Sequence, residues 1–158
     1  MQCELHFAMS FTSMKGVCTS ILEGFGKDHG IRQATLMDVQ AFLRSRSSRD
    51  DALSTEDVPT VERGCPGPKA FLGSKTKGIL CPGSSPQVVN LPSTCSDLKA
   101  SVLLLGVYYI LNLSYPSSYG QLLGFLQTFI VKRGSRFDRG YQSARLCSLI
   151  SACKQYLK

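Results

Sequence analysis

Residues 102–131 read VLLLGVYYILNLSYPSSYGQLLGFLQTFIV, two apolar segments separated by a short turn-forming run. The first segment is apolar on nearly all sides, which marks a buried element, and Asn112 is its one strongly polar residue. Its length and a capping signal before it, Thr94 followed three residues later by Asp97, favour a helix over a strand. We therefore predict a helix from Ser96 to Leu113.

A second helix is predicted from Ser118 to Val131. Pro116 disfavours the helical conformation at Tyr115, so the first helix should end before it, and a serine can then cap the next helix. The apolar residues that follow recur at i, i+3, i+4, i+7 and i+8, the stripe of a helix with one buried face. They are Leu122, Phe125, Leu126, Phe129 and Ile130.

A third, amphipathic helix from Tyr141 to Tyr156 should pack on this hairpin. Its apolar face holds Leu146, Leu149, Ile150, Cys153 and Leu157. These helices alone should be marginally stable, so part of their apolar surface should be completed by a partner. The candidate interaction surface is Leu122, Phe125, Phe129, Leu146 and Ile150.

A membrane-associated hairpin over residues 102–131 is an alternative reading of the same pattern. Spanning a bilayer takes roughly 20 mostly apolar residues, and the uninterrupted run is about half that length and ends at Asn112. A buried helical hairpin therefore fits better.

Two further, weaker helices are predicted near the N-terminus. One runs from Ser13 to Leu22, with Ser13 as its cap and Gly24 as its stop. The other runs from Thr35 to Arg44, where Thr35 and Asp38 have the spacing of a capping box.

The middle of the chain, residues 47–92, is rich in proline, glycine and serine and shows neither helical nor strand periodicity over most of its length. It is expected to be an irregular, disordered linker. A short strand over residues 87–90 is the exception, and Pro86 and Pro92 confine it to an edge or leave it unpaired. The sequence thus predicts a mainly α fold in three segments: an N-terminal helical segment (1–46), a linker (47–92) and a C-terminal helical unit (93–158).

Positive charge is concentrated near the C-terminus. The net charge is +7, and Lys132–Lys158 contains seven Lys or Arg and one Asp. The basic loop 132–145, with aromatic residues close by, could contact the phosphates of a nucleic acid through Arg133, Arg136 and Arg139. The alternative is a solvated turn whose cations favour the C-terminal end of the preceding helix.

The seven cysteines include no CxxC pair, and only two histidines are present, so a structural zinc site is not predicted. No secretory signal is visible, which indicates reduced thiols in an intracellular compartment. No nucleophile, base or phosphate-binding motif has supporting context. We therefore expect neither enzyme activity nor a cofactor.

Part of the chain resembles the C-terminal tail of a group of uncharacterised, mobile-element-derived fish proteins labelled as similar to sterile-alpha-motif-containing proteins. The resemblance covers roughly 45 of the 158 residues. The resemblance implies an all-helical terminal piece and assigns no functional residues to this chain. The long upstream region of such proteins is missing here, which leads us to expect a fragment or a shortened gene copy. The residues that carry it are Gln87–Pro92, Tyr108, Tyr109, Asn112, Leu113, Tyr115, Pro116, Leu123 and Phe125–Gln127.

The function expected from the sequence is a non-catalytic helical protein-interaction module. Its partner would be an unknown protein or a second copy of the chain. Nucleic-acid binding is the first alternative, and membrane association is the least favoured.

Overall fold

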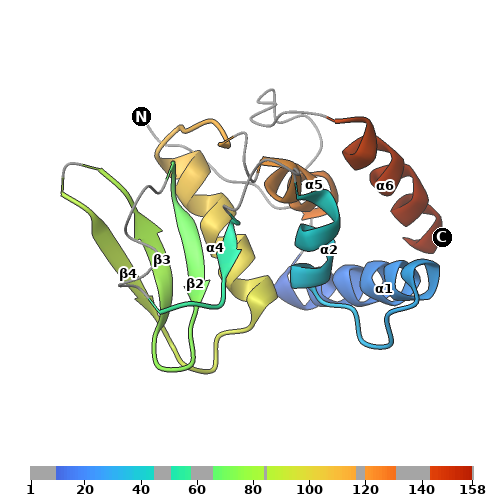
Figure 1. The fold of residues 1–158 in the computed structure, drawn as a ribbon, viewed down its shortest axis with the longest axis horizontal. Coiled ribbons are helices and arrows are strands. Elements are labelled where there is room, and N and C mark those ends of the chain that lie inside the picture. The colour runs from blue at the N-terminus through green and yellow to red at the C-terminus, as the bar shows by residue number, and fades with distance from the viewer. Residues whose placement is uncertain are drawn as a thin grey trace.

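The computed structural model describes residues 10–44, 51–57, 66–83, 85–116, 120–130 and 143–157. Within these ranges the chain forms five α-helices, one short 3-10 helix (η1) and a four-stranded sheet. Figure 1 shows the sheet at one end of the molecule, the helices α1, α2, α5 and α6 at the other, and α4 between them.

The prediction of a mainly α fold is wrong, because the segment expected to be irregular contains a mixed sheet and the fold is α/β. All four strands lie within residues 47–92. The sheet has the order β1-β2-β3-β4, with β1 parallel to β2 and the other neighbours antiparallel. The strands are β1 (Leu53–Ser54), β2 (Lys69–Leu72), β3 (Lys77–Cys81) and β4 (Gln87–Leu91).

The hairpin of β2 and β3 depends on two local features. Gly78 lies opposite Phe71, and a Cβ at Gly78 would come within 2.7 Å of the Phe71 ring, so no larger residue fits without a shift. The turn is held from outside by Asp57, whose carboxylate accepts hydrogen bonds from the Thr76 hydroxyl (3.0 Å) and from the N–H groups of Thr76 (3.1 Å) and Lys75 (3.4 Å).

The predicted short strand after Pro86 is confirmed as β4. It pairs with β3 alone among the described strands, and it forms one edge of the sheet. Pro86 and Pro92 flank it directly, which fits the confinement of proline to the ends and edges of sheets.

The predicted first helix of the hairpin is present as α4 (Asp97–Ile110), but it packs mainly on the sheet. Ser96 caps it by accepting a hydrogen bond from the N–H of Lys99 (3.1 Å). Leu104 and Leu105 are fully buried, and the Tyr108 hydroxyl donates to the carbonyl of Pro68 beside β2 (2.7 Å). Burial of most of its residues explains much of its apolar sequence, although Leu103 and Ile110 are 41% and 66% exposed.

The helix α4 ends earlier than predicted. Asn112 adopts a left-handed conformation with φ of 53°, and the N–H of Leu113 bonds to the carbonyl of Tyr108 (2.9 Å). Asparagine is one of the few residues that tolerate this conformation, and it closes the helix four residues before Pro116.

The remaining helices form a second layer. The helix α5 (Gly120–Ile130) packs against α2 (Leu36–Leu43) and α6 (Ala144–Lys154), whereas α6 and η1 (Gln155–Leu157) pack against α1. The capping box of Thr35 and Asp38 at the start of α2 is confirmed. Contacts therefore cross the expected boundaries between segments 1–46, 47–92 and 93–158.

The helix α1 (Phe11–His29) is longer at both ends than predicted. Ser10, rather than Ser13, accepts the capping hydrogen bond, and the helix ends at Gly30, which has a φ of 69°. The predicted stop, Gly24, lies inside the helix, where the ring of Tyr156 packs directly on its backbone. A Cβ at this position would overlap that ring.

Candidate functional site

The five residues predicted as an interaction surface belong to the core instead. Leu122, Phe125, Phe129 and Leu146 are buried, and Ile150 is partly buried against the same cluster. The rings of Phe125 and Phe129 meet edge to face with centroids 5.1 Å apart. The helices α1 and α2 cover the stripes of α5 and α6, so these side chains do not form an exposed surface.

The predicted nucleic-acid contacts Arg133, Arg136 and Arg139 lie outside the described residues. The last arginine of the basic loop, Arg145, is described and is engaged within the fold. Its guanidinium donates to the carbonyl of Phe42 at the end of α2 (3.0 Å) and lies 5.5 Å from the centre of the Phe42 ring. Arg145 thus stabilises the negative C-terminal end of α2.

Neither a membrane span nor a metal cluster occurs in the described ranges. None of the helices there has the length and apolar character needed to cross a bilayer. In the same ranges, no three His, Cys, Asp or Glu side chains gather as a metal site would require.

The outer side of β4 is an exposed edge of the sheet. Val88 and Val89 are 36% and 50% exposed, and no charged residue occurs between Gly78 and Ser96. The carbonyl oxygen of Val89 is turned toward β3, since it lies 2.7 Å from where a Cβ on Gly78 would stand. Because backbone groups alternate along a strand, those of Val88 and Asn90 face outward.

The opposite edge of the sheet is closed. The side-chain amide of Gln40 on α2 donates to the carbonyl of Leu53 (2.8 Å) and its oxygen accepts from the N–H of the same residue (2.9 Å). Gln40 and Leu53 are both buried. One glutamine thus occupies the backbone groups that β1 would offer to another strand.

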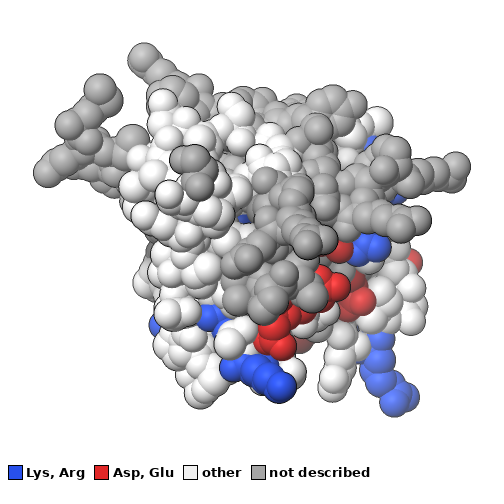
Figure 2. Space-filling model, turned by 60° about the vertical axis from the view of Figure 1, so that its left-hand side comes forward, with Lys and Arg blue, Asp and Glu red and all other residues white. Residues whose placement is uncertain are grey.

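Figure 2 turns the sheet side of the molecule toward the viewer. Acidic side chains gather in one band on this face, with lysine and arginine at its borders and a broad area of uncharged residues beside it.

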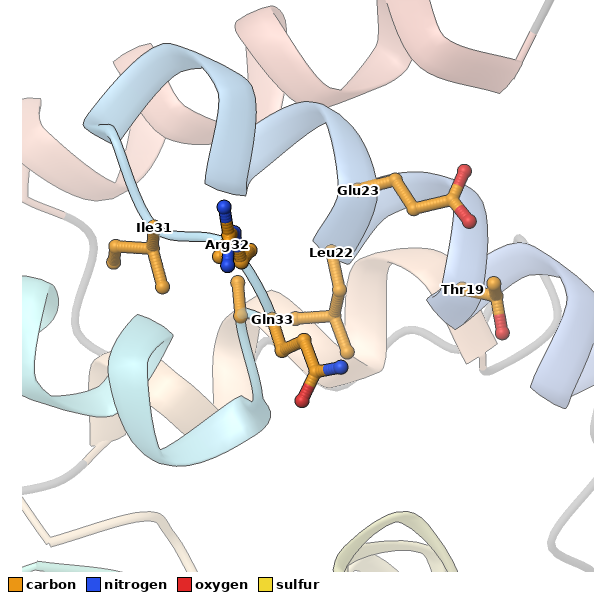
Figure 3. Close-up of a pocket in the computed structure, with 7 residues that line it drawn as sticks. Thr19, Leu22, Glu23, Ile31, Arg32 and Gln33 are labelled. Carbon is orange, nitrogen blue, oxygen red and sulfur yellow. The ribbon is translucent and has the colours of Figure 1, made fainter.

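A pocket of about 300 Å³ lies between α1 and the segment that leads to α2 (Figure 3). Leu22 and Gln33 approach each other in this view, whereas Glu23 points away from Arg32. The polar groups of this pocket do not converge on one point, so it offers no arrangement for chemistry.

A second pocket of about 340 Å³ lies where α2, β1 and β2 meet. Arg44 and Asp51 form a two-pronged ion pair at its border, with nitrogen–oxygen distances of 3.0 and 2.5 Å. Lys69 of β2 also lines it, although this residue is only 8% exposed. The full lining is Met37, Gln40, Arg44, Asp51, Leu53, Ser54, Thr55, Glu56 and Lys69.

Sequence reasoning predicted the edge position of β4 but missed the strand that it pairs with, and it missed this second pocket. The edge depends on strand pairing that spans the predicted linker, and the pocket combines residues from three separate segments. No protein-family model, no curated protein and no solved structure matches the chain.

Proposed function

We propose that this chain is a non-catalytic protein-interaction module that associates with a second copy of itself through β4. The observation that carries the proposal is the edge of β4, whose outward backbone groups have no strand neighbour in the described part of the chain. Exposed strand edges are templates for pairing with another strand, and proteins usually protect them with charged residues. Here β4 and the turns beside it carry no charge.

Antiparallel pairing of two β4 strands about Val89 gives the outward backbone groups of both copies the same hydrogen-bond partners. The outward groups of Val88 in one copy meet those of Asn90 in the other, and the two Val89 side chains lie opposite each other across the two-fold axis. The absence of charge supports a second copy as the partner. A chain with a net charge of +7 repels its own copy wherever basic surfaces meet, and a neutral strip avoids that cost.

The two edges of the sheet together limit the assembly. Gln40 closes the edge at β1, so a β4 strand cannot add there and continue the sheet from copy to copy. Pro86 and Pro92 restrict pairing at the open edge to the five residues of β4. The product is therefore a closed dimer with two-fold symmetry and not a fibre.

The dimer should be weak. Four backbone hydrogen bonds contribute about 1 kcal/mol net each, and this gain together with the burial of half-exposed valines is opposed by the entropy lost on association, so the dissociation constant should lie in the high micromolar to millimolar range. Sedimentation equilibrium over concentrations that bracket this range is the direct measurement.

The test compares two lysine substitutions on exposed apolar positions. Val89→Lys places two ammonium groups opposite each other across the axis and should give a monomer at all concentrations. Leu103→Lys, on the exposed side of α4, adds the same charge elsewhere and should leave the dimer intact. The proposal would be refuted if the unmodified chain stays monomeric at millimolar concentration, or if the dimer survives Val89→Lys. If the monomer instead binds a foreign extended peptide along β4, the partner is another protein and not a second copy.

A further inference from the structure

We infer that the C-terminal end of α4 binds the surface of an anionic lipid bilayer. The inference is independent of the proposed pairing through β4. It rests on an exposed apolar patch, the α4 tip, which consists of Leu103, Ile110, Leu111 and Leu113. Ile110 and Leu111 are 66% and 52% exposed, the two highest values among the large apolar side chains of the described residues. Single exposed apolar residues are ordinary, whereas several in one place mark an interaction site.

The backbone of the α4 tip is already hydrogen-bonded within the chain. The N–H groups of residues 111–113 donate to carbonyls of the last turns of α4, at distances of 2.9, 3.2 and 2.9 Å. The left-handed conformation of Asn112 closes the helix in this way. Moving an unpaired backbone donor out of water is costly, and these three donors do not carry that cost. The α4 tip can therefore enter the boundary between headgroups and acyl chains.

The two stretches of chain that meet at the α4 tip contain no acidic residue. The hydroxyl of Tyr108 donates to the carbonyl of Pro68 (2.7 Å), so the segment that leads into β2 adjoins this end of α4. No Asp or Glu occurs between Glu62 and Asp97, or between Asp97 and Asp138, although both stretches contain lysine and arginine. The net charge of the whole chain is +7. An anionic surface attracts such a chain, and no carboxylate of these stretches opposes the approach.

The shape of the α4 tip also suits a lipid surface. Exposure is highest at the last residue of α4 and the residue after it, so the apolar side chains project from the end of a helix. Leu103 lies on the same side of α4, about 10 Å back along the axis from Ile110, which matches the depth that interfacial elements reach. Lys99, one turn further on that side, is exposed and would lie at the level of the lipid phosphates.

The experiment is flotation of the full chain with vesicles of phosphatidylcholine alone and of an equal mixture of phosphatidylcholine and phosphatidylserine. The chain should float with the mixed vesicles and much less with the neutral ones. The binding should weaken as sodium chloride is added, because salt screens the attraction between the basic chain and the lipid headgroups.

A pair of serine substitutions tests the apolar contribution. Ile110→Ser combined with Leu111→Ser should weaken binding to the mixed vesicles at least tenfold, because it removes the two most exposed apolar side chains of the α4 tip. Leu157→Ser, in η1, removes an apolar side chain that is exposed elsewhere and should leave binding unchanged. All three positions are exposed, so the fold should be kept, and circular dichroism verifies this for each variant.

A fluorescent reporter tests the position of the contact. The chain contains no tryptophan, so Leu111→Trp introduces a single one. Its emission should shift to shorter wavelength on the mixed vesicles and should be quenched by lipids brominated on their acyl chains. Leu157→Trp is the matched control, and its emission should change with neither.

Four results would overturn the inference. Absence of flotation with the mixed vesicles would show that the α4 tip does not bind lipid, and its partner would then be a protein. Equal flotation with neutral vesicles would remove the anionic headgroups from the argument. Undiminished binding of the double serine variant, or a Leu111→Trp emission that brominated lipids do not quench, would show that another part of the chain makes the contact.

Discussion

Two glycines of α1 should respond in opposite ways to the same substitution. Gly16 lies on the exposed side of the helix, and a Cβ there meets no atom within 4 Å. Gly24 lies under the ring of Tyr156, and a Cβ there would overlap the ring. Alanine is favoured over glycine inside a helix by about 1 kcal/mol, so both sites share the same intrinsic gain.

The net effect at each site follows from what the new methyl group meets. Gly16→Ala should raise the free energy of unfolding by about 1 kcal/mol. Gly24→Ala must displace the Tyr156 ring, and overpacking of this kind costs about 1 to 3 kcal/mol, so the net result should be a loss of about 1 kcal/mol. In a Tyr156→Ala background the obstacle is gone, and Gly24→Ala should then stabilise the chain.

Urea denaturation followed by circular dichroism at 222 nm measures all of these variants. The expected coupling between Gly24 and Tyr156 is about 2 kcal/mol, well above the error of such measurements. Stabilisation of the otherwise unmodified chain by Gly24→Ala, equal to that by Gly16→Ala, would refute the packing of η1 on α1. Gly16→Ala serves as the matched control for helix propensity.

Three further outcomes are expected. The hydrogen bonds that Asp57 accepts from the β2–β3 turn lower the pKa of its carboxyl group. Their stabilisation is therefore present above the unfolded pKa of about 3.9 and is lost as the pH falls through the folded pKa. Asp57→Asn should lower the free energy of unfolding at pH 7, and the difference from the unmodified chain should shrink toward pH 2 in acid titrations of unfolding. Gln40→Leu leaves the buried N–H and C=O of Leu53 without partners and should cost about 2 to 4 kcal/mol in denaturant unfolding, whereas preserved stability would mean that water replaces the amide. Burial, with a smaller contribution from a nearby carboxylate, raises the pKa of the Cys18 thiol to about 11. The exposed Cys147 should therefore react with iodoacetamide at pH 8 long before Cys18 does. Mass spectrometry of the labelled peptides measures the two rates.

Features set by neighbouring residues could be predicted from the sequence. The capping box at Thr35 and Asp38 depends on a spacing of three residues, and the edge position of β4 follows from the prolines on both sides. The helix that became α4 could be predicted because its apolar run is long. Each of these features is local in the chain.

Features that depend on distant contacts could not be predicted. The strands β2 and β3 are short, and β2 begins with the buried Lys69, so neither shows the alternation by which strands are usually recognised. Their stability comes from pairing with each other and from the cover that α4 provides. Gly24 resembles a helix stop in the sequence, because the ring that occupies the place of its side chain belongs to Tyr156, more than a hundred residues away.

The candidate interaction surface failed for a related reason. An apolar stripe on a helix shows that a face is covered, but it does not identify the covering partner. The stripes of α5 and α6 are covered by α2 and α1 of the same chain, so no partner is needed there. A surface that does remain open in the described residues, along β4, consists mainly of backbone groups, and backbone groups cannot be recognised from the amino-acid composition.

The packing of α6 and η1 on α1 also bears on the order in which the chain can fold during synthesis. More than a hundred residues separate His29, at the end of α1, from Ala144, at the start of α6. At about 5 to 20 residues per second, α1 leaves the ribosome on the order of 10 s before its covering helix is made. The sheet and α4 are complete well before that. Nascent α1 therefore lacks the cover of α6 and η1 throughout this interval, and its backbone at Gly24 stays open until the ring of Tyr156 packs on it.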